Sequence, residues 1–155
     1  MPRPVHLLSL SIAALAGAAA IGAGLFFYRA QSLDAESQAY VNNAVPALAA
    51  AWNRDEFLER STPELRASVD PFELDKILRT LALLGRMVEY SGASGESAMA
   101  LPTSGGLGGT AAYVANVRFE NGTAILKIDL QRRDGKWLIS NFHADTVLTR
   151  RPENL

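Results

Sequence analysis

Residues 110–145 read TAAYVANVRFENGTAILKIDLQRRDGKWLISNFHAD, a long run in which apolar and polar residues alternate. The apolar positions of its first two segments are Tyr113, Ala115, Val117 and Phe119, then Ala124, Leu126, Ile128 and Leu130. Asn121-Gly122 between these segments favours a tight hairpin turn, and Asp134-Gly135 supplies a second turn before a strand that begins near Trp137. The run therefore predicts an antiparallel meander with one packed face.

Helical patterns precede this meander. Apolar and small residues recur every three or four positions at Leu33, Ser37, Tyr40, Val41, Ala44, Leu48 and Trp52. This spacing predicts an amphipathic helix, which Pro46 should kink or split because proline removes a helical hydrogen bond.

Capping signals predict further helical pieces, so that three of them occupy about 33–84. Asn53 stands three residues before Glu56 as in a capping box, and Thr62-Pro63-Glu64 starts another turn. The clearest start is Asp70-Pro71-Phe72-Glu73, with Gly85 as a natural stop. One apolar face follows that start, at Leu74, Ile77, Leu78, Leu81 and Leu84.

The segment between Gly85 and the meander is rich in Gly and Ser. Met87–Tyr90 and Glu96–Leu101 are short strand candidates, with a flexible hairpin loop after them. The loop lacks the GxxxxGK[ST] motif and is not followed by a helix, so it does not predict phosphate binding.

Composition limits the classes of function. The chain has 155 residues, 48% of them apolar, a net charge of −1 and no cysteine. This describes one globular domain without a basic surface for nucleic acid, a disulfide framework or a thiolate metal site. The acidic residues of the helical region are interpreted as caps and solvated positions, so we expect neither a metal site nor a cofactor.

The N-terminus contains LLSLSIAALAGAAAIGAGLFFY, residues 7–28, which carry no charge. As a helix it would span roughly 33 Å, enough for a bilayer core of about 30 Å. We interpret it as an uncleaved single-pass anchor. A cleaved signal peptide is the alternative, because Ala16-Gly17-Ala18 and Ala18-Ala19-Ala20 both fit a cleavage site. Cleavage there would leave an apolar end on a secreted chain.

The size of the part after the span predicts its orientation. Few residues precede the span and about 125 follow it, as in a signal anchor of a bacterial-type inner membrane whose domain is exported. The predicted organisation is an anchor at 1–30, an α+β domain at 31–150 and a tail at 151–155. Two rows of small residues, through Ala14, Ala18 and Gly22 and through Ala16, Ala20 and Gly24, could pair two spans.

The order of helices and then a curved meander resembles the nuclear transport factor 2-like superfamily, the cystatin-like α+β roll. The resemblance covers about residues 34–146 and is strongest in DGKWLISNF, residues 134–142. It implies a curved sheet packed on helices, with Trp137 and Ile139 beneath them. Such proteins include ketosteroid isomerase-like enzymes, ligand binders, transport factors and accessory domains of membrane systems, so the resemblance leaves the activity open.

One arrangement could place acid–base chemistry in the cavity of such a roll. In a regular last strand, Trp137, Ile139, Asn141, His143 and Asp145 point to the same side. His143 and Asp145 would be weak catalytic candidates, because ketosteroid isomerase-like chemistry needs a carboxylate base. The candidates for the pocket lining are Tyr40, Tyr90, Tyr113, Trp137 and Asn141. A bulge near Ser140 would instead turn His143 and Asp145 outward, into solvent.

Two hypotheses follow. The favoured one is a non-enzymatic, membrane-anchored and exported binding or assembly module. The alternative is a carrier of small apolar ligands, or a ketosteroid isomerase-like enzyme, that uses the roll cavity. The outward row of the meander, Asn116, Arg118, Lys127, Asp129 and Gln131, is polar. Such a row predicts a weak homodimer or a protein partner on the sheet.

Overall fold

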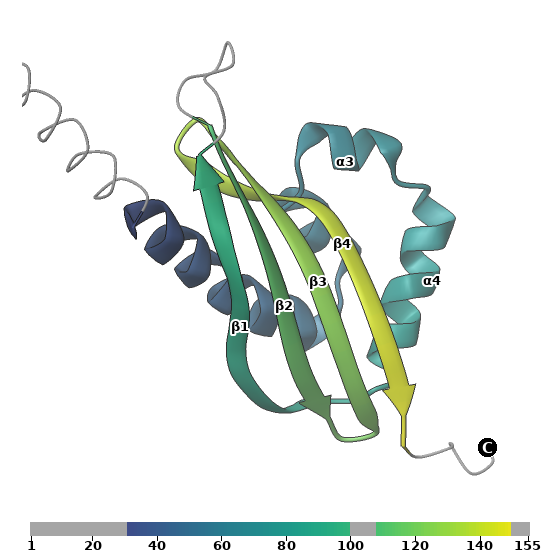
Figure 1. The fold of residues 1–155 in the computed structure, drawn as a ribbon. Coiled ribbons are helices and arrows are strands. Elements are labelled where there is room, and N and C mark those ends of the chain that lie inside the picture. Colours follow the sequence, from purple (N-terminus) through teal and green to yellow (C-terminus); the bar gives the residue numbers. More distant parts are fainter. Residues whose placement is uncertain (1–30, 100–107, 150–155) are drawn as a thin grey trace, which may run out of the picture. The chain divides into compact units, whose positions relative to one another are not determined.

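The computed structural model describes residues 31–99 and 108–149 (Figure 1). From Leu33 onward the chain forms one compact unit. Within the described residues, no helix is both long enough and apolar enough to cross a membrane. The predicted anchor at 7–28, its alternative cleavage sites, its small-residue rows and the tail at 151–155 lie outside the described residues.

The first described helix covers residues 31–51. Its predicted apolar stripe is confirmed, because Ser37, Val41, Leu48 and the following Trp52 are buried. The expected split at Pro46 is wrong, since the helix continues through that residue. Buried side chains on both sides of the proline, Val45 and Leu48, hold the helix together despite the missing hydrogen bond.

Three shorter helices follow, so the described residues contain four helical pieces rather than the predicted three. They are α2 (Arg54–Glu59), α3 (Pro63–Ser68) and α4 (Pro71–Ala82). Each begins at a predicted cap, namely Asn53, Thr62 and Asp70. The capping box at α2 is only half formed, because the Glu56 carboxylate accepts hydrogen bonds from Arg60 instead of reaching back to Asn53.

Helix α4 differs from its prediction at one position. Leu74, Leu78, Leu81 and Leu84 are buried as expected, but Ile77 is 42% exposed. Gly85 ends the helical region with a φ of 79°, which glycine adopts without strain.

The first strand, β1 (Met87–Met99), joins the predicted strand at Met87–Tyr90 to the described part of the predicted strand at Glu96–Leu101. Its register shifts between Tyr90 and Ala93, where Gly92 has a φ of 99°. A glycine in this conformation lets the strand bend without ending. Pairing with β2 keeps residues 91–95 in the strand, although no strand was predicted there. The hairpin loop predicted after the two strand candidates lies almost wholly outside the described residues.

The meander is formed by β2 (Gly109–Phe119), β3 (Gly122–Arg133) and β4 (Lys136–Leu148), and the sheet order is β1-β2-β3-β4. All neighbouring strands are antiparallel, and the predicted alternation of buried residues in β2 and β3 is confirmed. In Figure 1 the helices gather on one side of the sheet, with the 31–51 helix crossing behind β1 and β2. The described domain is therefore α+β, with helices covering one face of an antiparallel sheet.

The two turns of the meander differ from each other. Asp134 and Gly135 have φ angles of 49° and 78°, as the predicted tight turn requires. At the other turn the two connecting residues are Glu120 and Asn121, so the predicted Asn121-Gly122 pair is displaced by one position. Gly122 pairs with Phe119 inside the ladder, where a side chain would collide with Val147 and Leu84.

Candidate functional site

The inner face of the sheet is filled by side chains. Tyr113, Trp137 and Ile139 are 2%, 6% and 0% exposed, and Leu81 of α4 is 1% exposed. The hydroxyl groups of Tyr113 and Ser37 lie 2.8 Å apart and share a buried hydrogen bond. These residues therefore form core rather than the lining of an open pocket.

The other two tyrosines of the predicted pocket form hydrogen bonds with different partners. The Tyr40 hydroxyl donates to the carbonyl of Arg60, at 3.4 Å, and the Tyr90 hydroxyl donates to Asn42, at 2.8 Å. Burial raises the pKa of both phenols above their usual range. Each hydroxyl has a structural partner, so the three tyrosines do not converge on one ligand position.

A bulge decides the position of the catalytic candidates. Leu130 pairs with Ile139 and Asp129 pairs with Asn141, which leaves Ser140 as the extra residue in β4. Beyond the bulge Asn141, His143 and Asp145 point outward and are exposed. Of the two alternatives that the sequence left open, the structure shows the outward one, because one inserted residue reverses the side of every residue after it. Asn141 therefore faces away from the predicted pocket.

His143 and Asp145 nevertheless interact on the outer face. The His143 Nε2 atom lies 2.9 Å from Asp145, and the Lys127 amine lies 3.1 Å from the same carboxylate. Hydrogen bonds from Lys127 and His143 lower the pKa of Asp145. This keeps the carboxylate ionised beside two potential cations, in an exposed ion-pair group.

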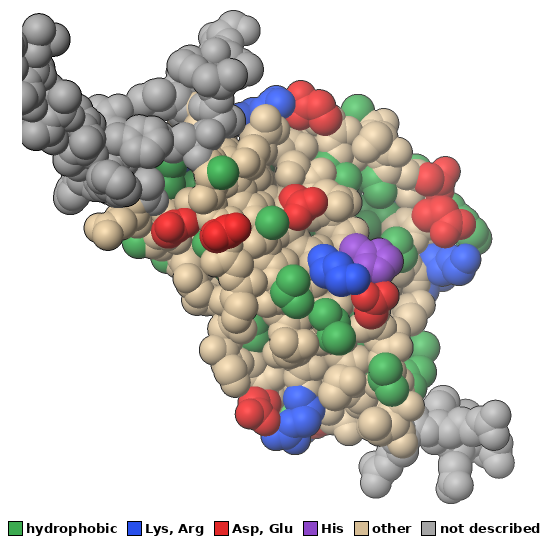
Figure 2. All heavy atoms as spheres, in the orientation of Figure 1, with side chains coloured by type: hydrophobic (Ala, Val, Ile, Leu, Met, Phe, Trp, Pro, Cys, Tyr) green, Lys and Arg blue, Asp and Glu red, His purple; other side chains and the backbone are tan. Residues whose placement is uncertain are grey.

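The outer face of the sheet mixes charged and aliphatic side chains (Figure 2). Arg118 pairs with Glu89 at 2.6 Å, while Val114, Ile125 and Val147 are 41%, 42% and 62% exposed. Of the predicted polar row, Asn116, Arg118 and Lys127 are exposed, whereas Asp129 and Gln131 are half-buried. The face is therefore more aliphatic than the predicted polar row.

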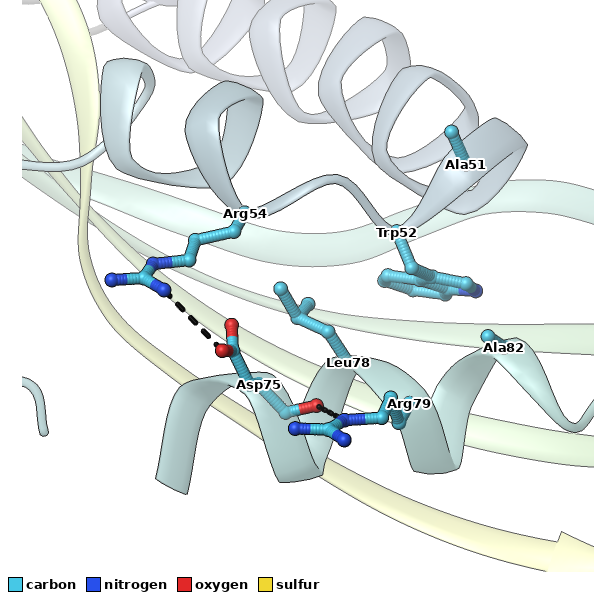
Figure 3. Close-up of a pocket in the computed structure, with 7 residues that line it drawn as sticks. All are labelled: Ala51, Trp52, Arg54, Asp75, Leu78, Arg79 and Ala82. Atoms are coloured by element: carbon cyan, nitrogen blue, oxygen red, sulfur yellow. Dashed lines mark hydrogen bonds and ion pairs between the residues drawn. The ribbon is translucent and has the colours of Figure 1, made fainter. Parts of the chain in front are cut away.

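A cleft of about 350 Å³ lies between the end of the 31–51 helix, α2 and α4 (Figure 3). Its floor is Trp52 and Leu78, and its rim carries Arg54, Asp75 and Arg79. Arg54 pairs with the Asp75 carboxylate at 3.3 Å, and Arg79 donates to the Asp75 carbonyl at 3.2 Å. Sequence reasoning treated Trp52 only as a core residue and missed the cleft, which arises from the packing of distant helices.

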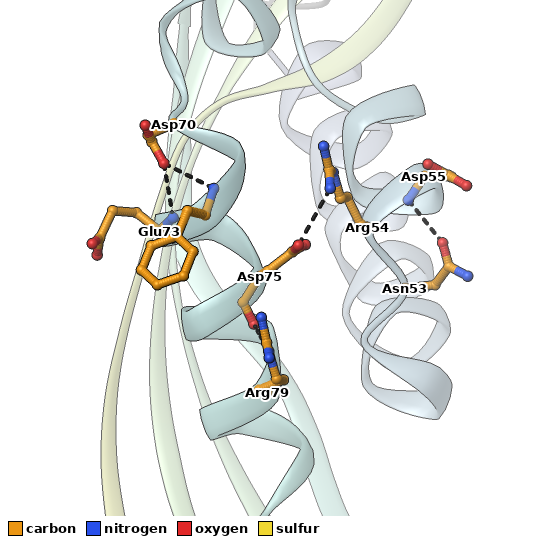
Figure 4. A network of polar contacts seen from close by, with 8 residues as sticks. Asn53, Arg54, Asp55, Asp70, Glu73, Asp75 and Arg79 are labelled. Atoms are coloured by element: carbon orange, nitrogen blue, oxygen red, sulfur yellow. Dashed lines mark hydrogen bonds and ion pairs between the residues drawn. The ribbon is translucent and has the colours of Figure 1, made fainter.

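Two polar residues near this cleft are helix caps. Figure 4 shows Asn53 and Asp70 accepting hydrogen bonds from backbone N–H groups in the first turns of α2 and α4, with the Arg54–Asp75 pair between these helices. No group of three potential metal ligands occurs within residues 31–99 and 108–149.

Comparison of the chain with protein-family models, with curated proteins and with solved structures found no match.

Proposed function

We propose that the protein is a non-enzymatic binding or assembly module, exported and held to a membrane by residues 7–28. In this proposal the domain is a roll of the nuclear transport factor 2-like type that acts through its surface. The observation that carries the proposal is the filled inner face of the sheet, where Tyr113, Trp137 and Ile139 occupy the positions that a ligand would need.

The enzyme and carrier alternatives require an interior cavity with convergent polar groups. The tyrosine hydroxyls bond to structural partners, and Phe142 packs edge-on against Phe57 with ring centroids 5.4 Å apart. The candidate acid–base pair, His143 and Asp145, faces solvent. These contacts favour packing over catalysis in the interior of the domain.

The outer face of the sheet suits a partner protein. Its exposed aliphatic residues supply apolar contacts, and the Arg118–Glu89 and Lys127–Asp145 pairs supply polar ones. Interfaces of transient complexes have this mixed composition. An anchor would raise the local concentration of the domain and so support a weak contact.

The interior can be tested with benzene as a small apolar probe. We expect benzene to leave the unfolding temperature of the full chain in mild detergent unchanged. Leu126→Ala provides the positive control, because truncating a buried side chain opens a cavity. Benzene that enters this cavity should raise the unfolding temperature of the variant. Stabilisation of the unaltered chain by benzene, or a small molecule purified with it at one per chain, would favour the carrier alternative.

The surface can be tested by photo-crosslinking in intact cells. A photoreactive residue at Ile125, on the outer face, should give a defined protein adduct. Leu83 is 61% exposed and belongs to the end of α4, so it serves as the matched control position. Crosslinked products of the same pattern and yield at Ile125 and Leu83 would contradict the binding of a partner protein at the outer face of the sheet.

A further inference from the structure

The two edges of the sheet are protected differently. Along the edge of β1, the Asp34 carboxylate accepts from the backbone N–H of Ser97 at 2.8 Å, and Gln38 donates to the carbonyl of Ala93 at 2.8 Å. Asn42 accepts from the N–H of Ala93 at 3.0 Å. Asp34, Gln38 and Asn42 are four residues apart, so one row of the 31–51 helix covers this edge against another strand.

Among residues 31–99 and 108–149, the edge of β4 is covered only near its beginning. The N–H of Thr62 donates to the carbonyl of Ile139, and the N–H of Ile139 donates to the carbonyl of Arg60, both at 2.8 Å. Residues 60–62 thus lie on this edge as a short parallel bridge at Ser61. The chain then leaves the edge and enters α3, so the second half of β4 has no such cover.

The register shows which backbone groups remain free. Ile139 faces the edge, and the bulge at Ser140 makes Phe142, Ala144, Thr146 and Leu148 the residues whose N–H and C=O point away from β3. Within residues 31–99 and 108–149, no hydrogen bond reaches these groups of Ala144 and Thr146 from the side of the open edge.

A groove of about 220 Å³ runs beside these free groups. Ala144 and Thr146 form one wall, and Ile77 and Leu81 of α4 are among the residues of the other. In Figure 1, α4 lies next to β4 on the side away from β3. The exposure of Ile77, which contradicted the amphipathic pattern of α4, places an apolar side chain where an added strand would cover it.

We propose that the free half of β4 is a docking site for an extended peptide segment of a partner protein, which adds to the sheet as a fifth strand. Its backbone would form hydrogen bonds with Ala144 and Thr146, along the same edge of β4 that residues 60–62 cover near the beginning of the strand. Alternate side chains of the segment would be apolar and would pack on Ile77.

The charges beside the edge define the other side chains of the peptide. His143 and Asp145 form the outward row next to it, so polar residues, with a basic one facing Asp145, suit the outward positions of the peptide. A second copy of β4 fits less well. Two-fold pairing of two β4 strands would bring both α4 helices to the same face of the joined sheet, beside the line where the two strands meet. A single extended segment meets only one α4.

The probe is a blocked nine-residue peptide of alternating valine and polar residues, added to the full chain in mild detergent. The expected result is slower hydrogen exchange of the Ala144 and Thr146 amides, with those of Ala93 and Ser97 unchanged. The same peptide with alternate amides N-methylated should bind at least about tenfold more weakly, because it lacks the donors of a strand.

Variants separate the groove from the rest of α4. Ile77→Lys should weaken peptide binding about tenfold or more, while the matched Leu83→Lys should leave it unchanged. Thr146→Pro removes an edge-facing donor without removing a bond to β3 and should also weaken binding. Equal binding to all variants, protection at β1, or a dimer of the unliganded chain that itself protects Ala144 would overturn the proposal.

This inference rests on the proposed function as a binding module, and the two fail differently. Benzene binding inside the unaltered domain would contradict the proposed function as a binding module, but it would not contradict the docking site at the edge of β4. Unchanged exchange of Ala144 and Thr146 at 5 mM peptide, a concentration about fivefold above a dissociation constant of 1 mM, would overturn only the docking site.

Discussion

Trp137 packs on the inner face near the start of β4 and is 6% exposed. Truncation of a buried Trp typically lowers the free energy of unfolding by about 3–5 kcal/mol, a large part of a total of roughly 5–15 kcal/mol. We therefore expect Trp137→Ala to destabilise the domain severely, as measured by chemical unfolding followed by circular dichroism. His143→Ala, at an exposed position of the same strand, should change stability by less than about 0.5 kcal/mol. Equal stability of the two variants would contradict the described burial.

Asp34 gives the fold a defined pH dependence. Hydrogen bonds from the hydroxyl and the backbone N–H of Ser97 lower the pKa of Asp34 from its ordinary value of 3.8. Near that pH the unfolded chain binds more protons at Asp34 than the folded chain does. The contribution of Asp34 to the free energy of unfolding is therefore present above pH 3.8 and is lost as the pH falls through the lower pKa of the folded state. We expect Asp34→Asn to be less stable than the unaltered chain at pH 7. The two stabilities, measured by urea unfolding, should converge as the pH falls below 3.8, and a constant difference would argue against a hydrogen bond to the ionised carboxylate.

The 31–51 helix protects the β1 edge through single side chains, and Asn42 makes two of these contacts. It accepts hydrogen bonds from the Tyr90 hydroxyl at 2.8 Å and from the Ala93 N–H at 3.0 Å. Asn42→Ala should cost about 1–3 kcal/mol of stability and speed the exchange of the Ala93 amide, because both donors lose their partner. Asn43→Ala changes the exposed neighbouring residue and provides the control. Equal exchange rates in the two variants would show that the edge is held by other contacts.

The strands with strict alternation could be predicted from the sequence, because β2 and β3 place one row of side chains in the core and one in solvent. Helix starts could also be predicted, since Asn53, Thr62 and Asp70 are caps that act locally. Strand β1 could be predicted only at its two ends. Its continuity through residues 91–95 could not, because this Gly/Ser-rich stretch carries little alternation and its order comes from pairing with β2. The direction of His143 and Asp145 depended on whether β4 has a bulge near Ser140, and the sequence left the regular and the bulged strand open as alternatives.

The candidate surfaces were harder to predict than the core. The cleft beside Trp52 joins residues from α2 and α4, and the groove beside Ala144 joins α4 to β4. Their residues are far apart in the sequence and share no motif. One signal was present in the apolar face of α4, where five positions were predicted as core and Ile77 is the one that remains exposed.

At the scale of the whole molecule, we propose a domain that works while it is held to a membrane through residues 7–28. The most direct test uses two separate samples of membranes containing the full chain: one is washed with carbonate, and the other is kept sealed and treated with protease from the outer side. We predict that the uncleaved chain of 16.7 kDa stays in the membrane pellet and that external protease removes its domain. A soluble chain beginning at Ala19 or Ile21, or a membrane-bound domain reached only from the cytoplasmic side, would contradict the account.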